Sequence, residues 1–141
     1  MLEPMEQPNN RTCGQTTVAM LTNVPIKSII TIYGHSSTSS VGEAKKALKV
    51  LGYRHSQTFK IDNRKHLENQ MMLQGTKKFI RIKYGAREIG HFLAMDTDGK
   101  VYDTNKKVYN DVYEMLEEYN RIWKKRDGRK VHVSHYFEIY E

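Results

Sequence analysis

Apolar residues in the first part of the chain recur at the spacing of amphipathic helices. In residues 12–22, Val18 and Leu21 are placed to share one buried side of a helix that begins near Cys13. Pro25 lacks the N–H group that a helix interior needs, so this helix is expected to end before the proline. The cysteine therefore falls in the first turn of a predicted helix.

Two further helices are predicted from the same spacing. Residues 26–33 form a short amphipathic segment that ends at Gly34, and the polar loop that follows closes with Ser40, a good helix-capping residue. The next helix, residues 41–51, has the clearest pattern, and Gly52 supplies its C-terminal stop. Its apolar residues at helical spacing are Val41, Ala44, Ala47, Leu48 and Leu51.

The middle of the chain changes from helical spacing to alternation. Residues 53–61 are expected to be extended, and residues 63–73 to form another helix. From residue 78 the period becomes two, which predicts a strand over residues 78–84. A hairpin loop between Gly85 and Gly90 then leads into a returning strand, H-F-L-A-M-D.

The last third of the chain is predicted to complete an antiparallel sheet. Asp98-Gly99 is a strong turn signal, and residues 100–103 form the strand after it. Residues 112–125 have the apolar face of a long helix, and residues 131–140 alternate as a last strand. Helices come first and antiparallel strands second. The predicted fold class is therefore α+β, with an N-terminal helical half packed on a C-terminal antiparallel sheet.

Length and composition fit one domain, residues 1–141, with a single compact core. Cys13 is the only cysteine, which excludes an intrachain disulfide and a zinc site built on several thiolates. A reducing, cytoplasmic location is expected. The N-terminus has no basic and apolar signal, and no run of about eighteen apolar residues occurs, so neither secretion by that route nor a membrane span is expected.

The chain is basic, with 23 Lys and Arg against 16 Asp and Glu and a net charge of +7. Such a charge attracts an acidic partner surface or a polyanion. Much of the excess lies in residues 124–126 and 129–130, far along the chain from the cysteine. Basic runs of this kind are usually solvated helix ends, so nucleic acid is not expected as a partner.

Cys13 has the surroundings of a nucleophile. Gly14 allows close backbone approach, and the predicted helix N-terminus directs free N–H groups and a positive dipole end at the sulfur. Both favour the thiolate, which is the attacking species in catalysis by cysteine. Gln7 lies six positions before the cysteine, where a loop can fold its amide N–H toward an oxyanion forming beside the sulfur.

His91 is the candidate base, because it follows a glycine and opens a predicted core strand. Alternation puts His91, Leu93 and Met95 on one face of that strand. The imidazole is therefore expected to point at a helix packed on this face.

Asp103 is the candidate acid that orients the imidazole and fixes its tautomer. With the turn at Asp98-Gly99, residues that face each other across it have numbers that sum to about 197. The numbers of His91 and Asp103 sum to 194, and a loop or bulge accounts for a difference of this size. Asn105 is a substitute for Asp103. Asp96 is a weaker one, because alternation places it on the strand face opposite to His91.

Two segments of the sequence, one around Cys13 and one that begins at Gly90, resemble motifs of papain-like cysteine peptidases. Q-P-N-N-R-T-C-G-Q-T-T-V-A-M-L resembles their Gln-x5-Cys-Gly opening, and is similar in particular to the bacteriocin-processing, double-glycine-cleaving peptidases. G-H-F-L-A-M-D-T-D-G-K-V-Y-D-T-N resembles the second motif of that family. The resemblance implies a papain-like fold. It also implies that Gln7 is the oxyanion-hole residue, Cys13 the nucleophile, His91 the base and Asp103 the orienting acid.

The chain departs from the family's pattern at two places. Gln15-Thr16-Thr17 follows Cys-Gly, where the family commonly has a small apolar residue, and Thr104 stands where a proline is usual.

The predicted function is a cysteine peptidase or isopeptidase that hydrolyses an amide bond of a protein or peptide substrate through a thioester. No metal or organic cofactor is expected. A deamidase or transferase would use the same residues. Two alternatives come from other classes: a catalytically inactive papain-like binding module, which the four intact residues argue against, and a small basic nucleic-acid-binding protein, which the aromatic residues near the C-terminus support only weakly.

Overall fold

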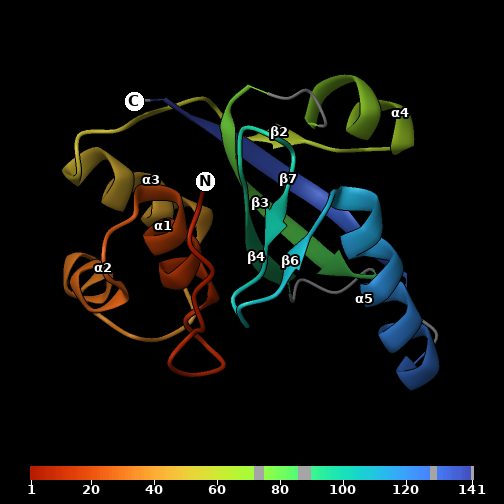
Figure 1. The fold of residues 1–141 in the computed structure, drawn as a ribbon, viewed down its shortest axis with the longest axis horizontal. Coiled ribbons are helices and arrows are strands. Elements are labelled where there is room, and N and C mark those ends of the chain that lie inside the picture. Colours follow the sequence, from red (N-terminus) through yellow and green to blue (C-terminus); the bar gives the residue numbers. More distant parts are fainter. Residues whose placement is uncertain (72–74, 86–89, 128–129, 141) are drawn as a thin grey trace.

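The computed structural model describes the chain except residues 72–74, 86–89, 128–129 and 141. Three helices come first in the chain and lie together on one side of a sheet, and the others lie across it (Figure 1). No helix in the described part of the chain has the length and apolar character to cross a bilayer. The helices are α1 (Cys13–Thr22), α2 (Ile26–Tyr33), α3 (Val41–Val50), α4 (Arg64–His66), the π-helical turn η1 (Leu67–Met71) and α5 (Val112–Asp127).

One antiparallel sheet forms the middle layer. Its strand order is β1-β7-β3-β4-β5-β6, and β2 also pairs with β7. The pairing of β3 with β7 extends from Lys77 opposite Ile139 to Tyr84 opposite Val131, with a register shift between Arg81 and Ile82. The strands are β1 (Arg54–His55), β2 (Phe59–Lys60), β3 (Lys77–Tyr84), β4 (Gly90–Met95), β5 (Val101–Tyr102), β6 (Val108–Tyr109) and β7 (Val131–Tyr140).

Alternation along the strands divides the apolar side chains between two cores. Phe79, Phe92 and Phe137 face α1, α2 and α3, and the rings of Phe79 and Phe137 stack with centroids 4.9 Å apart. Ile80 and Leu93 lie on the other face and pack with α5. The sheet is therefore buried on both faces, which makes its central strands a rigid support for side chains near their ends.

Helix α1 is buried on all sides, from Gly14 to Thr22. The sequence predicted a helix with one buried side; this was wrong, because α2, α3 and the sheet all pack around it. Two of its buried threonines therefore bond to the helix itself: Thr17 Oγ1 donates to Cys13 O (2.7 Å) and Thr22 Oγ1 donates to Val18 O (2.7 Å). The cysteine helix is thus the centre of the N-terminal half.

Several predicted elements are confirmed. Helix α2 has the predicted bounds, and Ser40 caps α3 in a capping box with Glu43, in which each side chain accepts from the other residue's backbone N–H. The strands predicted at residues 78–84 and 131–140 match β3 and β7 closely.

Helix α1 ends at Thr22, before Pro25 as predicted, and the left-handed Asn23 (φ of 57°) is its C-cap. Other predicted elements needed correction. Residues 53–61 contain only the two-residue strands β1 and β2, and the helix predicted at 63–73 is the short α4 followed by a π-helical turn. The C-terminal end of that predicted helix, residues 72–73, and residues 86–89 of the predicted hairpin loop lie outside the described residues.

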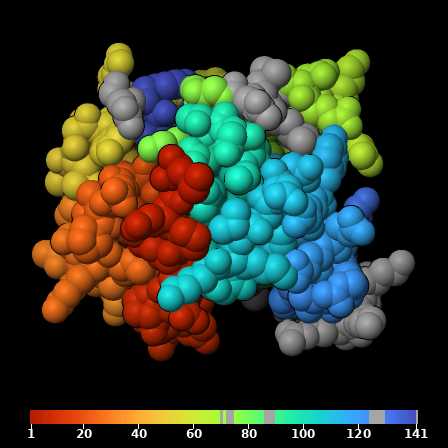
Figure 2. All heavy atoms as spheres, in the orientation of Figure 1, coloured from red at the N-terminus to blue at the C-terminus, as the bar shows by residue number. Residues whose placement is uncertain are grey.

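The N-terminal segment joins the two halves of the molecule. In the space-filling view it lies in the seam between the helices of the first half and strands β4 to β6 (Figure 2). Glu6 forms an isolated antiparallel bridge with Asn105, and Leu2 N donates to the Asp96 carboxylate (3.0 Å). Gln7 is therefore carried to the sheet, next to the loop that follows β5.

Candidate active site

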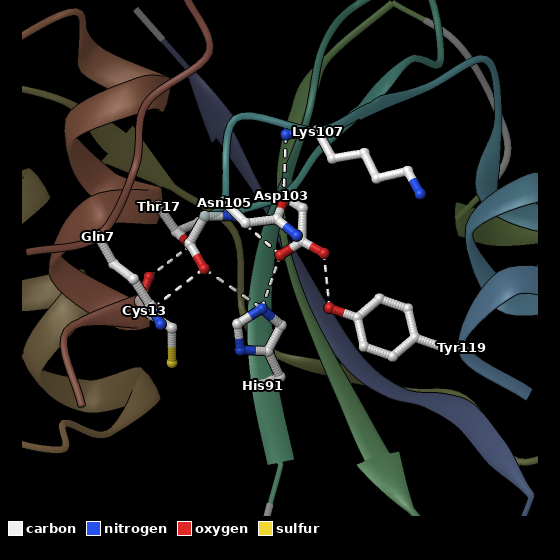
Figure 3. A network of polar contacts seen from close by, with 9 residues as sticks. Gln7, Cys13, Thr17, His91, Asp103, Asn105, Lys107 and Tyr119 are labelled. Atoms are coloured by element: carbon white, nitrogen blue, oxygen red, sulfur yellow. Dashed lines mark hydrogen bonds and ion pairs between the residues drawn. The ribbon is translucent and has the colours of Figure 1, made fainter. Parts of the chain in front are cut away.

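Cys13 is the first residue of α1, at the N-terminal end of the helix. Its side chain is half-buried, and Figure 3 shows the sulfur facing the imidazole of His91. Burial by itself would raise the pKa of the Cys13 thiol, but the hydrogen bond and positive charge of His91, with the N–H groups of Phe92 and Gly14, lower the pKa below its usual value. The site therefore favours the thiolate.

The loop that precedes α3 packs closely against the start of α1. A Cβ atom at Gly14 would lie 2.1 Å from Ser39 Oγ and 3.3 Å from a ring carbon of Phe92, so only glycine leaves room for this contact. Gln15 Nε2 holds the same loop by donating to the carbonyl oxygens of His35 (3.3 Å) and Ser37 (2.9 Å). The departure from the family's pattern at Gln15 thus has a structural role here.

His91 lies at an open end of strand β4. It pairs with Ile82 of β3 on one side, whereas β5 pairs only with the far end of β4, at Ala94 and Met95. The imidazole can therefore contact both halves of the molecule: Cys13 from α1 and Tyr119 from α5, whose ring centroid is 6.2 Å away.

The expectation that the cysteine helix packs on the face of His91 was wrong. Leu93 and Met95 share that face and pack with α5, whereas α1 covers the face that carries Phe92 and Ala94. The imidazole meets the thiol at the edge of the sheet instead, because no further strand among the described residues pairs with this part of β4 beyond β3.

Asp103 is the carboxylate that the structure brings to His91. Its Oδ1 lies 2.7 Å from His91 Nε2, which leaves Nδ1 of the ring toward the sulfur (Figure 3). Asp103 is only 1% exposed, and Thr104 N (2.7 Å to Oδ1) and Tyr119 OH (2.5 Å to Oδ2) also donate to it. With these partners, both carboxylate oxygens are held in place.

Each charged group of the site stabilises the charged form of its neighbour. Burial tends to lower the pKa of His91, but the hydrogen bonds and charges of Asp103 and Cys13 raise it to about 9. Burial likewise tends to raise the pKa of Asp103, and bonding to His91 and Tyr119 lowers it. An imidazolium between a thiolate and a carboxylate is the state that this arrangement stabilises.

The two alternatives to Asp103 bond to other partners. Asn105 accepts a bond from Lys107 N (3.1 Å), and Asp96 accepts from Leu2 N and Thr97 N. The pairing of β4 with β5 places Ala94 opposite Tyr102. Continued by one residue, this register places Asp103 opposite Leu93, and therefore diagonally across from His91 on the same face of the sheet.

Gln7 is held by the residue that follows Asp103. Its backbone N–H donates to Thr104 O (2.6 Å), and Thr104 Oγ1 donates to Gln7 Oε1 (3.0 Å). Because the carbonyl oxygen of the amide is fixed in this way, the amide N–H₂ is left for another partner, and the side chain extends toward Cys13 (Figure 3). The amide group of Gln7 is thus held on the side of the site where Cys13 lies.

Sequence reasoning missed two residues of this network, Thr104 and Tyr119. Thr104 was seen only as a departure from the usual proline, although its hydroxyl group also lies 3.4 Å from His91 Nε2. Tyr119 was expected on the apolar face of its helix. A tyrosine hydroxyl at such a position needs a polar partner, and that signal points to a buried acceptor.

Comparison with solved structures supports the architecture. The structure is similar to the crystal structure of the Pseudomonas avirulence protein AvrPphB, with a TM-score of 0.60 and 13% sequence identity over 96% of this chain and 94% of that one. Scans of protein-family models and of curated proteins gave no match. At this identity the likeness establishes the fold alone, and the predicted papain-like α+β fold is confirmed.

Thr104→Val is expected to lower kcat/KM on a peptide substrate about tenfold, because it removes the hydroxyl that holds the Gln7 amide while keeping the volume of the side chain. Thr104→Ser should retain most of the activity. In a Gln7→Ala background the valine substitution should cost little further, because the bond to Gln7 (3.0 Å) is shorter than the contact of the same hydroxyl with His91 Nε2 (3.4 Å). Steady-state kinetics of these variants check this; a full further loss in the double variant would contradict it.

Proposed function

We propose that this protein is a papain-like cysteine hydrolase that cleaves peptide or isopeptide bonds. One observation carries the proposal: the Cys13 thiol, at the start of a helix, faces an imidazole whose Nε2 lies 2.7 Å from the buried carboxylate of Asp103. A thiol activated by an oriented imidazole is the arrangement of nucleophilic catalysis by cysteine.

The first step forms a thioester. The Cys13 thiolate attacks the carbonyl carbon of the scissile amide, and the negative charge moves to the carbonyl oxygen. The backbone N–H of Cys13, which as a first-turn group has no partner within its helix, and the Gln7 amide donate to this oxyanion. The protonated His91 then gives its proton to the leaving nitrogen, and the amine product departs.

The second step releases the acid product. Neutral His91 takes a proton from water, and the resulting hydroxide attacks the thioester carbon. The carbon–sulfur bond breaks, Cys13 leaves as thiolate, and His91 remains protonated, so the starting ion pair is restored. Asp103 stays ionised throughout and holds Nε2. No cofactor has a role in either step.

The resemblance to bacteriocin-processing peptidases supports a polypeptide substrate. Thr104 and Gln15, where the chain departs from that family, bond to Gln7 and to the loop before α3. Because these departures contact Gln7 and the loop before α3, part of which lines the cavity beside Cys13, we do not extend the double-glycine substrate to this chain. A reducing, cytoplasmic environment would keep the thiol of Cys13 in its reactive state.

The proposal is tested with a library of proteome-derived peptides, incubated with the wild-type protein and with Cys13→Ala and analysed by mass spectrometry. We expect new peptide termini with the wild type alone, and a thioester that hydroxylamine traps. A mass increase of about 1 Da at glutamine without chain cleavage would indicate a deamidase that uses the same residues. Equal activity of Cys13→Ala, or neither cleavage nor deamidation by the wild type, would overturn the proposal.

A further inference from the structure

Residues 2–11 form a segment that we call the N-terminal strap; it lies in the seam between the two halves of the molecule and leads into α1 (Figure 2). Among these residues, all of which the structure describes, only Leu2 is buried; Met5 and Gln7 are half-buried and the others are exposed. Leu2 is 5% exposed and belongs to the core that α1, α2 and α3 form with the sheet. The strap therefore has one buried anchor at Leu2 and another at Thr12, where α1 begins.

Asp96 holds the anchor at Leu2. Its carboxylate is buried, and Oδ2 accepts from Leu2 N (3.0 Å) while Oδ1 accepts from Thr97 N (2.7 Å). Asp96 directly follows β4, and the turn toward β5 fixes its backbone: Asp96 N donates to Lys100 O (2.9 Å) and Gly99 N donates to Asp96 O (3.0 Å). Hydrogen bonds to a charged acceptor are stronger than those between neutral groups, so this contact clips the strap to a rigid turn.

Beyond Leu2 the strap follows the loop after β5. Lys106 N donates to Met5 O (3.1 Å), and two residues later Gln7 makes its two bonds with Thr104. Thr104 directly follows the acid of the site, Asp103. The stretch of chain from β4 to this loop therefore carries the imidazole and its acid, and it also holds the strap that brings Gln7 to them.

The strap buries little surface between its anchors, where residues 3–11 are exposed or half-buried. A surface segment with few buried contacts opens locally at a small free-energy cost, so the bonds of Gln7 depend on the anchor at Leu2. The Cys13 thiol and the His91 imidazole are held by α1 and β4 instead. Release of the strap from the turn would therefore displace Gln7 first, and an oxyanion donor acts only when it is held where the charge develops.

We propose that Asp96 is a positioning residue for the reaction: by clipping Leu2 to the end of β4, it holds Gln7 where its amide donates to the oxyanion. This inference rests on the proposed function. The sequence offered Asp96 as a weaker alternative for orienting His91, and the bond to Leu2 gives the same carboxylate a role on the oxyanion side of the site. Loss of the clip should lower kcat, because the oxyanion forms only during the reaction, and should leave the ionisation of Cys13 unchanged.

The first measurement is hydrogen exchange of the Gln7 amide, which donates to Thr104 O (2.6 Å). Asp96→Ala removes the clip and Leu2→Ala the buried side chain, so each should speed this exchange about tenfold while amides of the β3–β7 ladder exchange as before. Leu2→Met, which keeps the side-chain volume, and Asp98→Ala, whose carboxylate bonds within the turn, are matched controls and should exchange like the wild type. Unchanged Gln7 exchange in both test variants, or equal acceleration of the β3–β7 amides, would overturn the inference.

The second measurement compares kcat for peptide hydrolysis with the rate of Cys13 alkylation by iodoacetamide at pH 6. Asp96→Ala and Leu2→Ala should each lose about tenfold in kcat per mole of Cys13 that can be alkylated, and should keep an alkylation rate within about twofold of the wild type. In a Gln7→Ala background, Asp96→Ala should cost less than about twofold further, because its effect passes through Gln7.

A full tenfold further loss in that double variant, or an alkylation rate that falls in step with kcat, would overturn the inference and leave the proposed function standing. Absence of peptide cleavage by the wild type would overturn the proposed function, and the role of Asp96 in it.

Discussion

His91→Ala is expected to lower the rate of Cys13 alkylation by iodoacetamide at pH 6 by about a hundredfold. Without the imidazolium, burial raises the pKa of the thiol and only the N–H groups of Phe92 and Gly14 oppose it. An ordinary thiol with a pKa of about 8.5 is only roughly 0.3% ionised at pH 6. Because the pKa of the wild-type thiol is lowered, a larger fraction of it should be ionised there, and mass spectrometry of the intact protein measures both rates.

The same variant should lose about 10²- to 10⁴-fold in peptide hydrolysis, because His91 both activates the thiol and protonates the leaving nitrogen. His132→Ala, at an exposed histidine of β7, is the matched control and should react like the wild type. Thermal unfolding of each variant separates loss of fold from loss of chemistry. Equal alkylation rates in wild type and His91→Ala at pH 6 would mean that no activated pair exists.

The sequence was sufficient to predict an element where the residues that mark its ends lie within or next to that element. Ser40, Glu43 and Gly52 mark the two ends of α3, and β3 and β7, with eight and ten residues, are long enough to show a strand pattern in their own sequence. Strand β6, by contrast, has two residues, too few to show a period, and it exists because it pairs with β5. It was not predicted.

The residues of the candidate site likewise divide into those with a local signal in the sequence and those without one. Cys13, Gln7 and His91 were chosen as candidates because each lies next to a local marker: a helix start, a fixed spacing or a glycine before a strand. The choice of Asp103 over Asn105 depended on the register of a turn, which the structure supplies. The contacts of Thr104 and Tyr119 join segments distant in the chain, and no local pattern identifies the partner of either hydroxyl.

Asp103→Ala is the other substitution with a large expected effect, about 10²- to 10³-fold in kcat/KM. It removes the acceptor at His91 Nε2, so the ring can rotate and its protonated state loses a charged partner. Burial then lowers the pKa of His91, with only Cys13 left to raise it. In the wild type, activity should fall as the pH rises through about 9, where His91 loses its proton and the ion pair ends. In the variant this alkaline limb should move to lower pH.

Asp103→Asn separates orientation from charge, because an amide oxygen still accepts from Nε2 but carries no charge. We expect a smaller loss of kcat/KM than in Asp103→Ala, with the alkaline limb also shifted down. Asp98→Ala, at an exposed turn residue, is the matched control and should keep the wild-type profile. Tyr119→Phe added to Asp103→Ala should restore some stability, because it removes a hydroxyl left without its acceptor. An alkaline limb that stays near pH 9 in both Asp103 variants would show that Asp103 does not set the pKa of His91.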